Sequence, residues 1–117
     1  HVDIIGHPTG RLLGRREPYK VDMERVIEAA AKTGTALEIN SFPDRLDLND
    51  VHARWAKEAG VLIAIDTDAH SPGELDYLEY GIGTARRAWL EKDDILNCRS
   101  WEELQEIFAR CSSTTRR

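Results

Sequence analysis

The sequence predicts an α/β domain built on a parallel β-sheet. Three short apolar segments, at residues 1–5, 35–40 and 61–65, alternate with stretches whose apolar residues recur at helical spacing. The third segment is almost entirely apolar, as is typical of a parallel strand that is covered on both faces. Strands joined in this way form right-handed crossovers, in sheets that are either doubly wound or closed into a barrel.

Two helices are predicted between these strands. Asp22 is a typical N-cap residue, a helical pattern follows it, and Gly34 is a natural stop. The second helix is predicted at residues 49–59, with Gly60 directly after its end. Together with the helical stretches predicted after the third strand, these helices give three repeats of strand, loop and helix.

Additional helices are predicted after the third strand. Two short ones are expected at residues 74–80 and 84–90, and a last one begins at Ser100, where Ser100 and Glu103 have the spacing of a capping box. Residues 112–117 are predicted to be a disordered polar tail. The tryptophans of all the predicted helices occupy apolar positions and are predicted to belong to the core: Trp55, Trp89 and Trp101.

Composition limits the classes of function. The chain of 117 residues is 41% hydrophobic and 32% charged, which fits one globular domain. A formal net charge of -5 argues against a wholly basic nucleic-acid-binding surface but allows a local basic patch. No apolar run is long enough to span a bilayer. Cys98 and Cys111 read as small apolar residues rather than a metal-binding pair or a disulfide framework, so a reducing, cytoplasmic location is expected.

Histidines and carboxylates gather where the predicted strands end. His7 follows the first strand, and Asp66, Asp68 and His70 follow the third. Ligands of parallel α/β folds bind at the carboxyl ends of the strands. Residues two apart in extended backbone point to the same side, so Asp68 and His70 can reach one metal ion or adjacent ions, with His7 approaching from the neighbouring loop.

A mixed set of imidazole and carboxylate ligands suits Zn²⁺, Mn²⁺ or Fe²⁺ better than Ca²⁺. A purely structural interpretation of the same residues stays open, in which Asp68 forms a turn and His70 caps the helix that follows. The three groups His7, Asp68 and His70 are the predicted metal-binding and catalytic residues. No Ser or Cys nucleophile with an adjacent base is evident, which makes a covalent route less attractive.

The loop at residues 11–20 is basic and lies beside His7. Guanidinium groups bind phosphate bidentately, so Arg11 and Arg16 are predicted to bind the phosphate of a substrate. The alternative is a solvated loop in which the arginines pair with Glu17 and Glu24.

Four stretches resemble one family, in order along almost the whole chain: HVDIIGHPTGR, LEIN followed by DRLDL, DTDAH, and GIGTARRAWLEKDDILN. They resemble the C-terminal part of the PHP (polymerase and histidinol phosphatase) domain of bacterial family X DNA polymerases. The resemblance implies a distorted TIM-like barrel whose rim binds three metal ions. It also implies Mn²⁺-dependent 3′–5′ exonuclease activity and related phosphoester cleavages at DNA ends and abasic sites.

Within this resemblance, His7 matches the family ligand in HPTG, and Asp68 and His70 match the two ligands of the D-x-H motif. Glu38 belongs to the family-like LEIN stretch but is not assigned as a ligand. The other ligands of the family lie upstream of this chain, which has no H-x-H motif. The chain is therefore expected to be three βα units of an incomplete barrel, a single partial domain over residues 1–117 with extra C-terminal helices.

Several expectations follow for an incomplete barrel. Taken alone, the chain should bind metal weakly and catalyse poorly, because the three-metal cluster requires the upstream part. Its expected partners are DNA, an N-terminal polymerase and the remaining PHP segment, and its open barrel edge should favour self-association. Two alternatives stay open: a PHP-type phosphatase of a small phosphomonoester such as histidinol phosphate, and a non-catalytic module that positions a polymerase.

Overall fold

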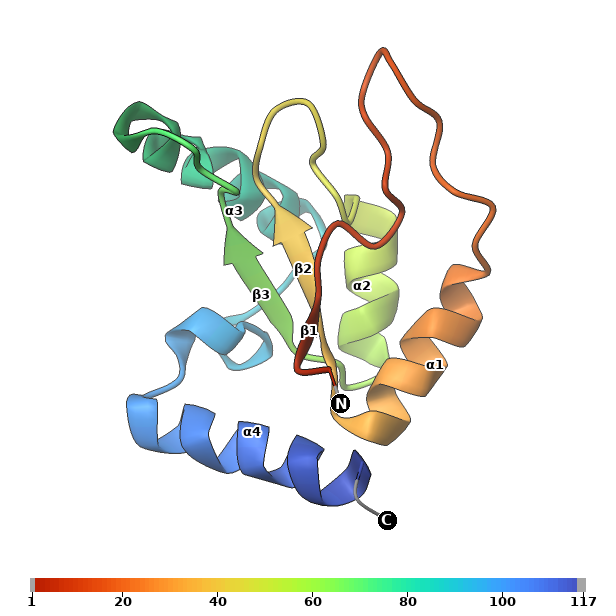
Figure 1. Ribbon diagram of the computed structural model, residues 1–117, viewed down its shortest axis with the longest axis vertical. Coiled ribbons are helices and arrows are strands. Elements are labelled where there is room, and N and C mark those ends of the chain that lie inside the picture. Colours follow the sequence, from red (N-terminus) through yellow and green to blue (C-terminus); the bar gives the residue numbers. More distant parts are fainter. Residues whose placement is uncertain (1, 116–117) are drawn as a thin grey trace.

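The structure is a computed structural model that describes the backbone of residues 2–115 and side chains up to residue 110. Three parallel strands form its centre (Figure 1). β1 (Ile4–Ile5), β2 (Ala36–Asn40) and β3 (Ile63–Asp66) lie side by side in chain order. The predicted α/β class and parallel sheet are thereby confirmed, and the sheet is open in the part of the chain that the structure describes.

The two faces of the sheet differ in chemistry because residues along β2 alternate between them. Leu37 and Ile39 are fully buried in the main apolar cluster, which includes Ile27 of α1 and Ala53 of α2. On the opposite face, Ala36 packs in a smaller cluster with residues of the C-terminal helix. Polar residues continue that second face toward the carboxyl end of the sheet, where Glu38 lies opposite Ala64 and Asn40 lies opposite Asp66.

The helices between the strands begin and end as predicted. α1 (Met23–Thr33) has Asp22 as its N-cap, which accepts a hydrogen bond from the Arg25 N–H at 3.2 Å. It ends at Gly34 in the left-handed conformation with φ 72. α2 (Asp50–Glu58) is capped by Asn49, whose side chain accepts from the His52 N–H at 2.8 Å.

The predicted pair of short helices after β3 is wrong. A 3-10 helix, η1 (Pro72–Tyr77), leads directly into α3 (Leu78–Arg87), which runs without a break through residues 81–83, between the two predicted helices. A side chain at Gly81 would collide with Ser41 and Ile65, so this glycine lets α3 approach the sheet closely. Two short 3-10 helices follow, η2 (Lys92–Asp94) and η3 (Leu96–Cys98).

The last helix, α4 (Trp101–Thr115), lies across the amino end of the sheet (Figure 1). The predicted capping box at its start is present, because Ser100 Oγ accepts from the Glu103 N–H at 3.2 Å. The predicted polar tail is helical as far as Thr115, and residues 116–117 lie outside the described part. None of the helices in the described residues is long and apolar enough to cross a membrane.

The assignment of the three tryptophans to the core is wrong. Trp89 and Trp101 are 66% and 65% exposed, and Trp55 is 39% exposed. Trp89 follows the end of α3 with φ 61, and its ring lies under the Arg54 guanidinium at 4.2 Å instead of packing inward. Cys98 is exposed, and the side chain of Cys111 lies outside the described residues.

The outer edge of β3 is covered by its own chain. Ile95 forms a parallel bridge with Ile63, and the Asn97 side chain both accepts from the Ile65 N–H and donates to the Ile65 carbonyl, each at 2.8 Å. The edge available for another strand is therefore that of β1, which pairs with β2 alone among the described strands.

Candidate functional site

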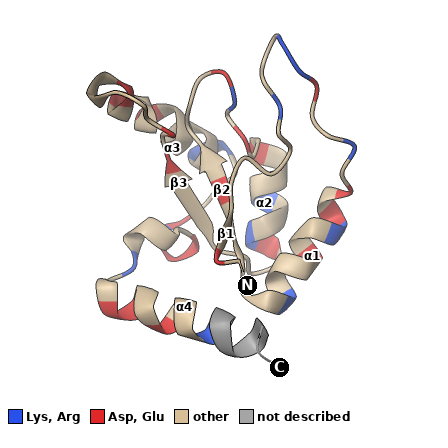
Figure 2. Cartoon of the chain, in the orientation of Figure 1, with Lys and Arg blue, Asp and Glu red and all other residues tan. Residues whose placement is uncertain are grey.

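The three predicted ligands all lie at the carboxyl end of the sheet. His7 follows β1, whereas Asp68 and His70 follow β3. The end of β2 lies between them and presents Glu38 and Asn40 on one face of the sheet. Figure 2 shows acidic residues at this end of the sheet and basic residues in the long loop that follows β1.

Asp68 is held by a buried amide from the middle strand. Asn40, which is 1% exposed, donates from Nδ2 to Asp68 Oδ2 at 3.1 Å. Its Oδ1 accepts from the Phe42 N–H at 3.0 Å, which determines the orientation of the amide. Asp68 itself has φ 54, in the left-handed region that non-glycine residues rarely adopt.

The backbone at His7 is held by a second side chain of the same strand. The His7 N–H donates to Glu38 Oε1 at 2.7 Å, and His7 also has a positive φ of 26. Glu38 is 9% exposed, so its carboxylate reaches the loop from inside the molecule. The sequence placed Glu38 near this end of the sheet without assigning it a role.

Three carboxylates crowd together beside these residues. The partial burial of its carboxyl group, its hydrogen bond to Glu38, and the charges of Glu38 and Asp68 raise the pKa of Asp66 to about 8, against a smaller opposing effect of the Asp68 N–H. Asp66 therefore keeps its proton at neutral pH and hydrogen-bonds to Glu38.

The ring of His70 has a defined orientation. Its Nδ1 is 2.7 Å from the carbonyl oxygen of Asp68, and its backbone N–H donates to Glu74 Oε2 at 2.6 Å. Metal-binding histidines commonly use one ring nitrogen for such a carbonyl and the other for the ion. In this arrangement Nε2 is the nitrogen left for a ligand.

The HPTGR loop is fastened by Asp47, a residue that is fully buried. Asp47 Oδ2 accepts from the Thr9 N–H at 3.0 Å, the Thr9 hydroxyl at 2.8 Å and the Gly10 N–H at 3.1 Å. Asp47 therefore joins the loop after β2 to the loop that carries His7.

Arg11 and Arg16 contact the backbone of their own region. Arg11 donates from Nε to the Arg45 carbonyl at 2.9 Å and from Nη2 to the Leu46 carbonyl. Arg16 donates from Nε to the Gly10 carbonyl at 2.9 Å, and its guanidinium lies 5.6 Å from the centre of the Tyr19 ring. Both also line an open hollow of about 470 Å³ in the loop, so the predicted contact with phosphate stays a prediction.

The described residues do not by themselves form a complete metal centre. No group of three or more His, Cys, Asp or Glu side chains within them is close enough to hold an ion. His7, Asp68 and His70 thus share one end of the sheet without converging on one point. Any ion bound here would need further ligands.

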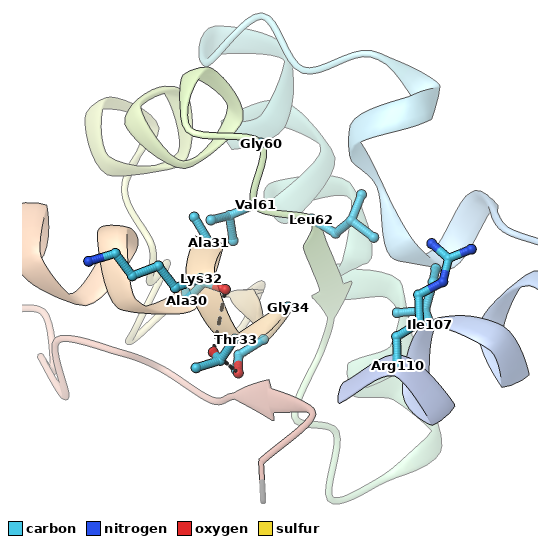
Figure 3. Close-up of a pocket in the computed structure, with 11 residues that line it drawn as sticks. Ala30, Ala31, Lys32, Thr33, Gly34, Gly60, Val61, Leu62, Ile107 and Arg110 are labelled. Atoms are coloured by element: carbon cyan, nitrogen blue, oxygen red, sulfur yellow. Dashed lines mark hydrogen bonds between the residues drawn. The ribbon is translucent and has the colours of Figure 1, made fainter. Parts of the chain in front are cut away.

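A separate pocket of about 300 Å³ lies at the opposite end of the sheet (Figure 3). It is formed where the end of α1, the loop before β3 and α4 meet, and includes Thr33, whose hydroxyl is 2.8 Å from that of Thr35. None of the predicted ligands lines it, so it is no part of the candidate site.

Comparisons with known proteins identify the relatives of this chain. No family model matches it. It is 48% identical over 110 residues to the DNA polymerase/3'-5' exonuclease PolX of Bacillus subtilis (strain 168), an alignment that covers 94% of this chain and 19% of that protein. This match bears out the resemblance of the chain to the C-terminal part of the PHP domain of bacterial family X DNA polymerases.

Proteins named as probable phosphatases are also among the relatives of this chain. It is 34% identical over 103 residues to a probable phosphatase of Thermoanaerobacter sp. (strain X514), covering 83% of the chain and 40% of the relative. A probable phosphatase of Shewanella sp. (strain ANA-3) is 30% identical over 102 residues, with 82% and 38% covered. The chain thus spans less than half the length of each of these relatives, and the family resemblance seen in its motifs is confirmed.

Proposed function

We propose that this chain contributes to a metal-dependent phosphoesterase that hydrolyses DNA phosphodiesters at 3′ ends, within a larger DNA repair polymerase. The observation that carries the proposal is the 48% identity to a protein named as both a DNA polymerase and a 3'-5' exonuclease. The proposal includes a distorted TIM-like PHP barrel, to which the three parallel βα units belong. DNA, the polymerase and the remaining PHP segment are its proposed partners, in the cytoplasm.

Divalent ions belong to this proposal, and the donors of the chain fit them. His70 has one ring nitrogen held by a carbonyl, and Asp68 has its carboxylate oriented by Asn40. Nitrogen and oxygen donors together suit Mn²⁺, Zn²⁺ or Fe²⁺. A cluster of three ions would need ligands beyond the described residues, because these form no group of three.

Bound ions would lower the pKa of water, so that a nucleophile able to attack phosphorus is available near neutral pH, and they would stabilise the leaving oxygen. His7, Asp68 and His70 are the residues that would hold the ions. The guanidinium groups of Arg11 and Arg16 would hold the phosphate backbone in register. The hydrogen bonds that Asp47 accepts from Thr9 and Gly10 hold the loop that carries His7.

The test uses the intact protein with Mn²⁺ and 3′-labelled DNA. His7→Ala and His70→Ala should each reduce the rate of nucleotide release by 10-fold or more, because each removes an ion ligand. His52→Ala is the matched control, since His52 lies on α2 beside Trp55 and is not a candidate ligand. Unchanged hydrolysis by His7→Ala would contradict the proposal and favour a non-catalytic module that positions the polymerase.

A second candidate function is a phosphatase of a small phosphomonoester such as histidinol phosphate. It is favoured by the probable phosphatases among the relatives, at 34% and 30% identity. Rates on p-nitrophenyl phosphate and on 3′-labelled DNA, measured with the same preparation, distinguish the two. Turnover of the small ester without release of nucleotides would support the phosphatase.

A further inference from the structure

The face of β2 that points away from the main apolar cluster carries two polar side chains, at the end of the sheet where the candidate ligands gather. Glu38 and Asn40 are two residues apart and therefore lie on the same face of the strand. Both are buried, at 9% and 1% exposure, in a strand whose other side chains are apolar. Burying polar groups costs free energy unless they are hydrogen-bonded, so the partners of these two side chains indicate their role.

Each of the two has a candidate ligand as its partner. Glu38 Oε1 accepts from the backbone N–H of His7 at 2.7 Å, across 31 residues of sequence. Asn40 Nδ2 donates to the carboxylate of Asp68 at 3.1 Å, across 28 residues. One strand therefore holds residues that follow both of its neighbours.

Both partners are in backbone conformations that need support. His7 has φ 26 and Asp68 has φ 54, and residues other than glycine are strained at such positive φ values. Such strain persists only where the surroundings over-determine the conformation. The Glu38 carboxyl oxygen that accepts from the His7 N–H and the buried Asn40 amide that donates to Asp68 are contacts of that kind.

We propose that Glu38 and Asn40 are positioning residues, which hold the backbone of His7 and the carboxylate of Asp68 in the geometry that binds the ions. The inference rests on the proposed function in that it takes His7 and Asp68 as ligands. It assigns no direct contact with an ion to Glu38 or Asn40. Removing either side chain should weaken metal binding through its partner.

The first measurement needs no metal. Hydrogen exchange of the His7 amide in the intact protein is compared with that of the Leu37 amide, which donates to the Leu62 carbonyl in the same sheet. Glu38→Ala should speed exchange at His7 by 10-fold or more relative to Leu37. Glu38→Gln should retain slow exchange, because its carbonyl oxygen can still accept the bond.

The second measurement is the affinity for Mn²⁺, by calorimetry. Glu38→Ala and Asn40→Ala should each weaken it by 10- to 100-fold, as is typical when groups that orient a ligand are removed. Glu38→Gln should bind within a few-fold of the unsubstituted protein. Asn97→Ala is the matched control, because it removes an asparagine that binds the backbone of β3 rather than Asp68.

The outcomes separate the two proposals. Unchanged exchange at His7 in Glu38→Ala, or equal affinities for Asn40→Ala and Asn97→Ala, would overturn the positioning roles. Glu38→Gln as weak as Glu38→Ala in Mn²⁺ binding, with slow exchange kept, would overturn them by making Glu38 a ligand. An intact protein that binds no Mn²⁺ would refute the proposed function, and with it the idea that Glu38 and Asn40 position ligands of an ion. If Glu38→Ala still speeds exchange at His7 in such a protein, Glu38 has a structural role only.

Discussion

Asp47 is the residue on which the shape of the HPTGR loop depends most directly. One of its carboxylate oxygens accepts three hydrogen bonds from Thr9 and Gly10, in a fully buried position. The other oxygen, Oδ1, has no hydrogen-bond partner in the described structure. Through these three hydrogen bonds, Asp47 links the loop after β1 to the loop after β2.

Asp47→Ala should lower the free energy of unfolding by about 2–4 kcal/mol, because it leaves the N–H and the hydroxyl of the buried Thr9 without this acceptor. Asp47→Asn should cost less, since an amide oxygen can still accept. Urea denaturation followed by circular dichroism measures both. Asp76→Ala, at an exposed position of η1, is the control and should change stability by less than about 0.5 kcal/mol; an Asp47→Ala value as small as this would contradict the role given to Asp47.

At the scale of elements, Lys57 joins α2 to the segment after α3. Its Nζ donates to the Trp89 carbonyl at 2.8 Å and to Asp94 Oδ2 at 3.0 Å. Burial raises the pKa of Asp94, but the Glu91 N–H and the Lys57 ammonium outweigh it and hold the pKa below its ordinary value. The folded state therefore favours the ionised form of this carboxyl group.

This contact should make stability depend on pH. Since the pKa of Asp94 is lower in the folded than in the unfolded chain, its contribution is complete above the unfolded value of about 4 and is lost as the pH falls through the folded value. Lys57→Met should lower stability at pH 6 by about 1 kcal/mol and less at pH 2.5. Lys32→Met, which removes an exposed pair with Glu28, should have little effect at either pH; equal losses at both pH values for Lys57→Met would refute the interpretation.

The elements also show what sequence alone can and cannot predict. The strands and the first two helices follow from apolar spacing, caps and glycine stops, all of which are local signals. The local pattern predicts two short helices where η1 leads into a single α3. The close approach of Gly81 to Ser41 and Ile65 is a long-range contact that no local pattern reveals. Helical spacing likewise placed Trp89 in the core, although α3 ends before that residue.

The candidate site divides in the same way. His7, Asp68 and His70 could be placed at one end of the sheet because parallel strands bring their carboxyl ends together. Glu38 and Asn40 received no role, because their hydrogen bonds connect residues about 30 positions apart and depend on the register of β2. The structural contacts of Arg11 with backbone carbonyls were equally invisible in a pattern of charges.

At the scale of the whole molecule, charge is unevenly distributed. Basic residues concentrate in the loop after β1, whereas acidic residues line the first turn of α4 at the opposite end (Figure 2). The net charge of -5 therefore describes only an average. A polyanion such as DNA would approach with the basic loop toward it.

Arg16→Ala in the intact protein should weaken DNA binding and reduce the slope of log affinity against log salt by about 1, because one phosphate contact is lost. Fluorescence anisotropy at several salt concentrations measures the slope. Arg54→Ala is the control, since Arg54 belongs to α2 and its guanidinium lies over the ring of Trp89, away from the basic loop. If the salt slope of Arg16→Ala is unchanged, Arg16 does not contact the phosphate backbone.

The exposure of the tryptophans has a practical consequence for all of these measurements. Trp89 and Trp101 have most of their surface in water in the folded molecule, and Trp55 is half-exposed. Their emission already reports an aqueous environment, so its wavelength should shift little when the chain unfolds. Conversely, a blue shift on adding DNA or a partner domain would show that the outer surface of α2, or the end of α3 or start of α4, has been covered.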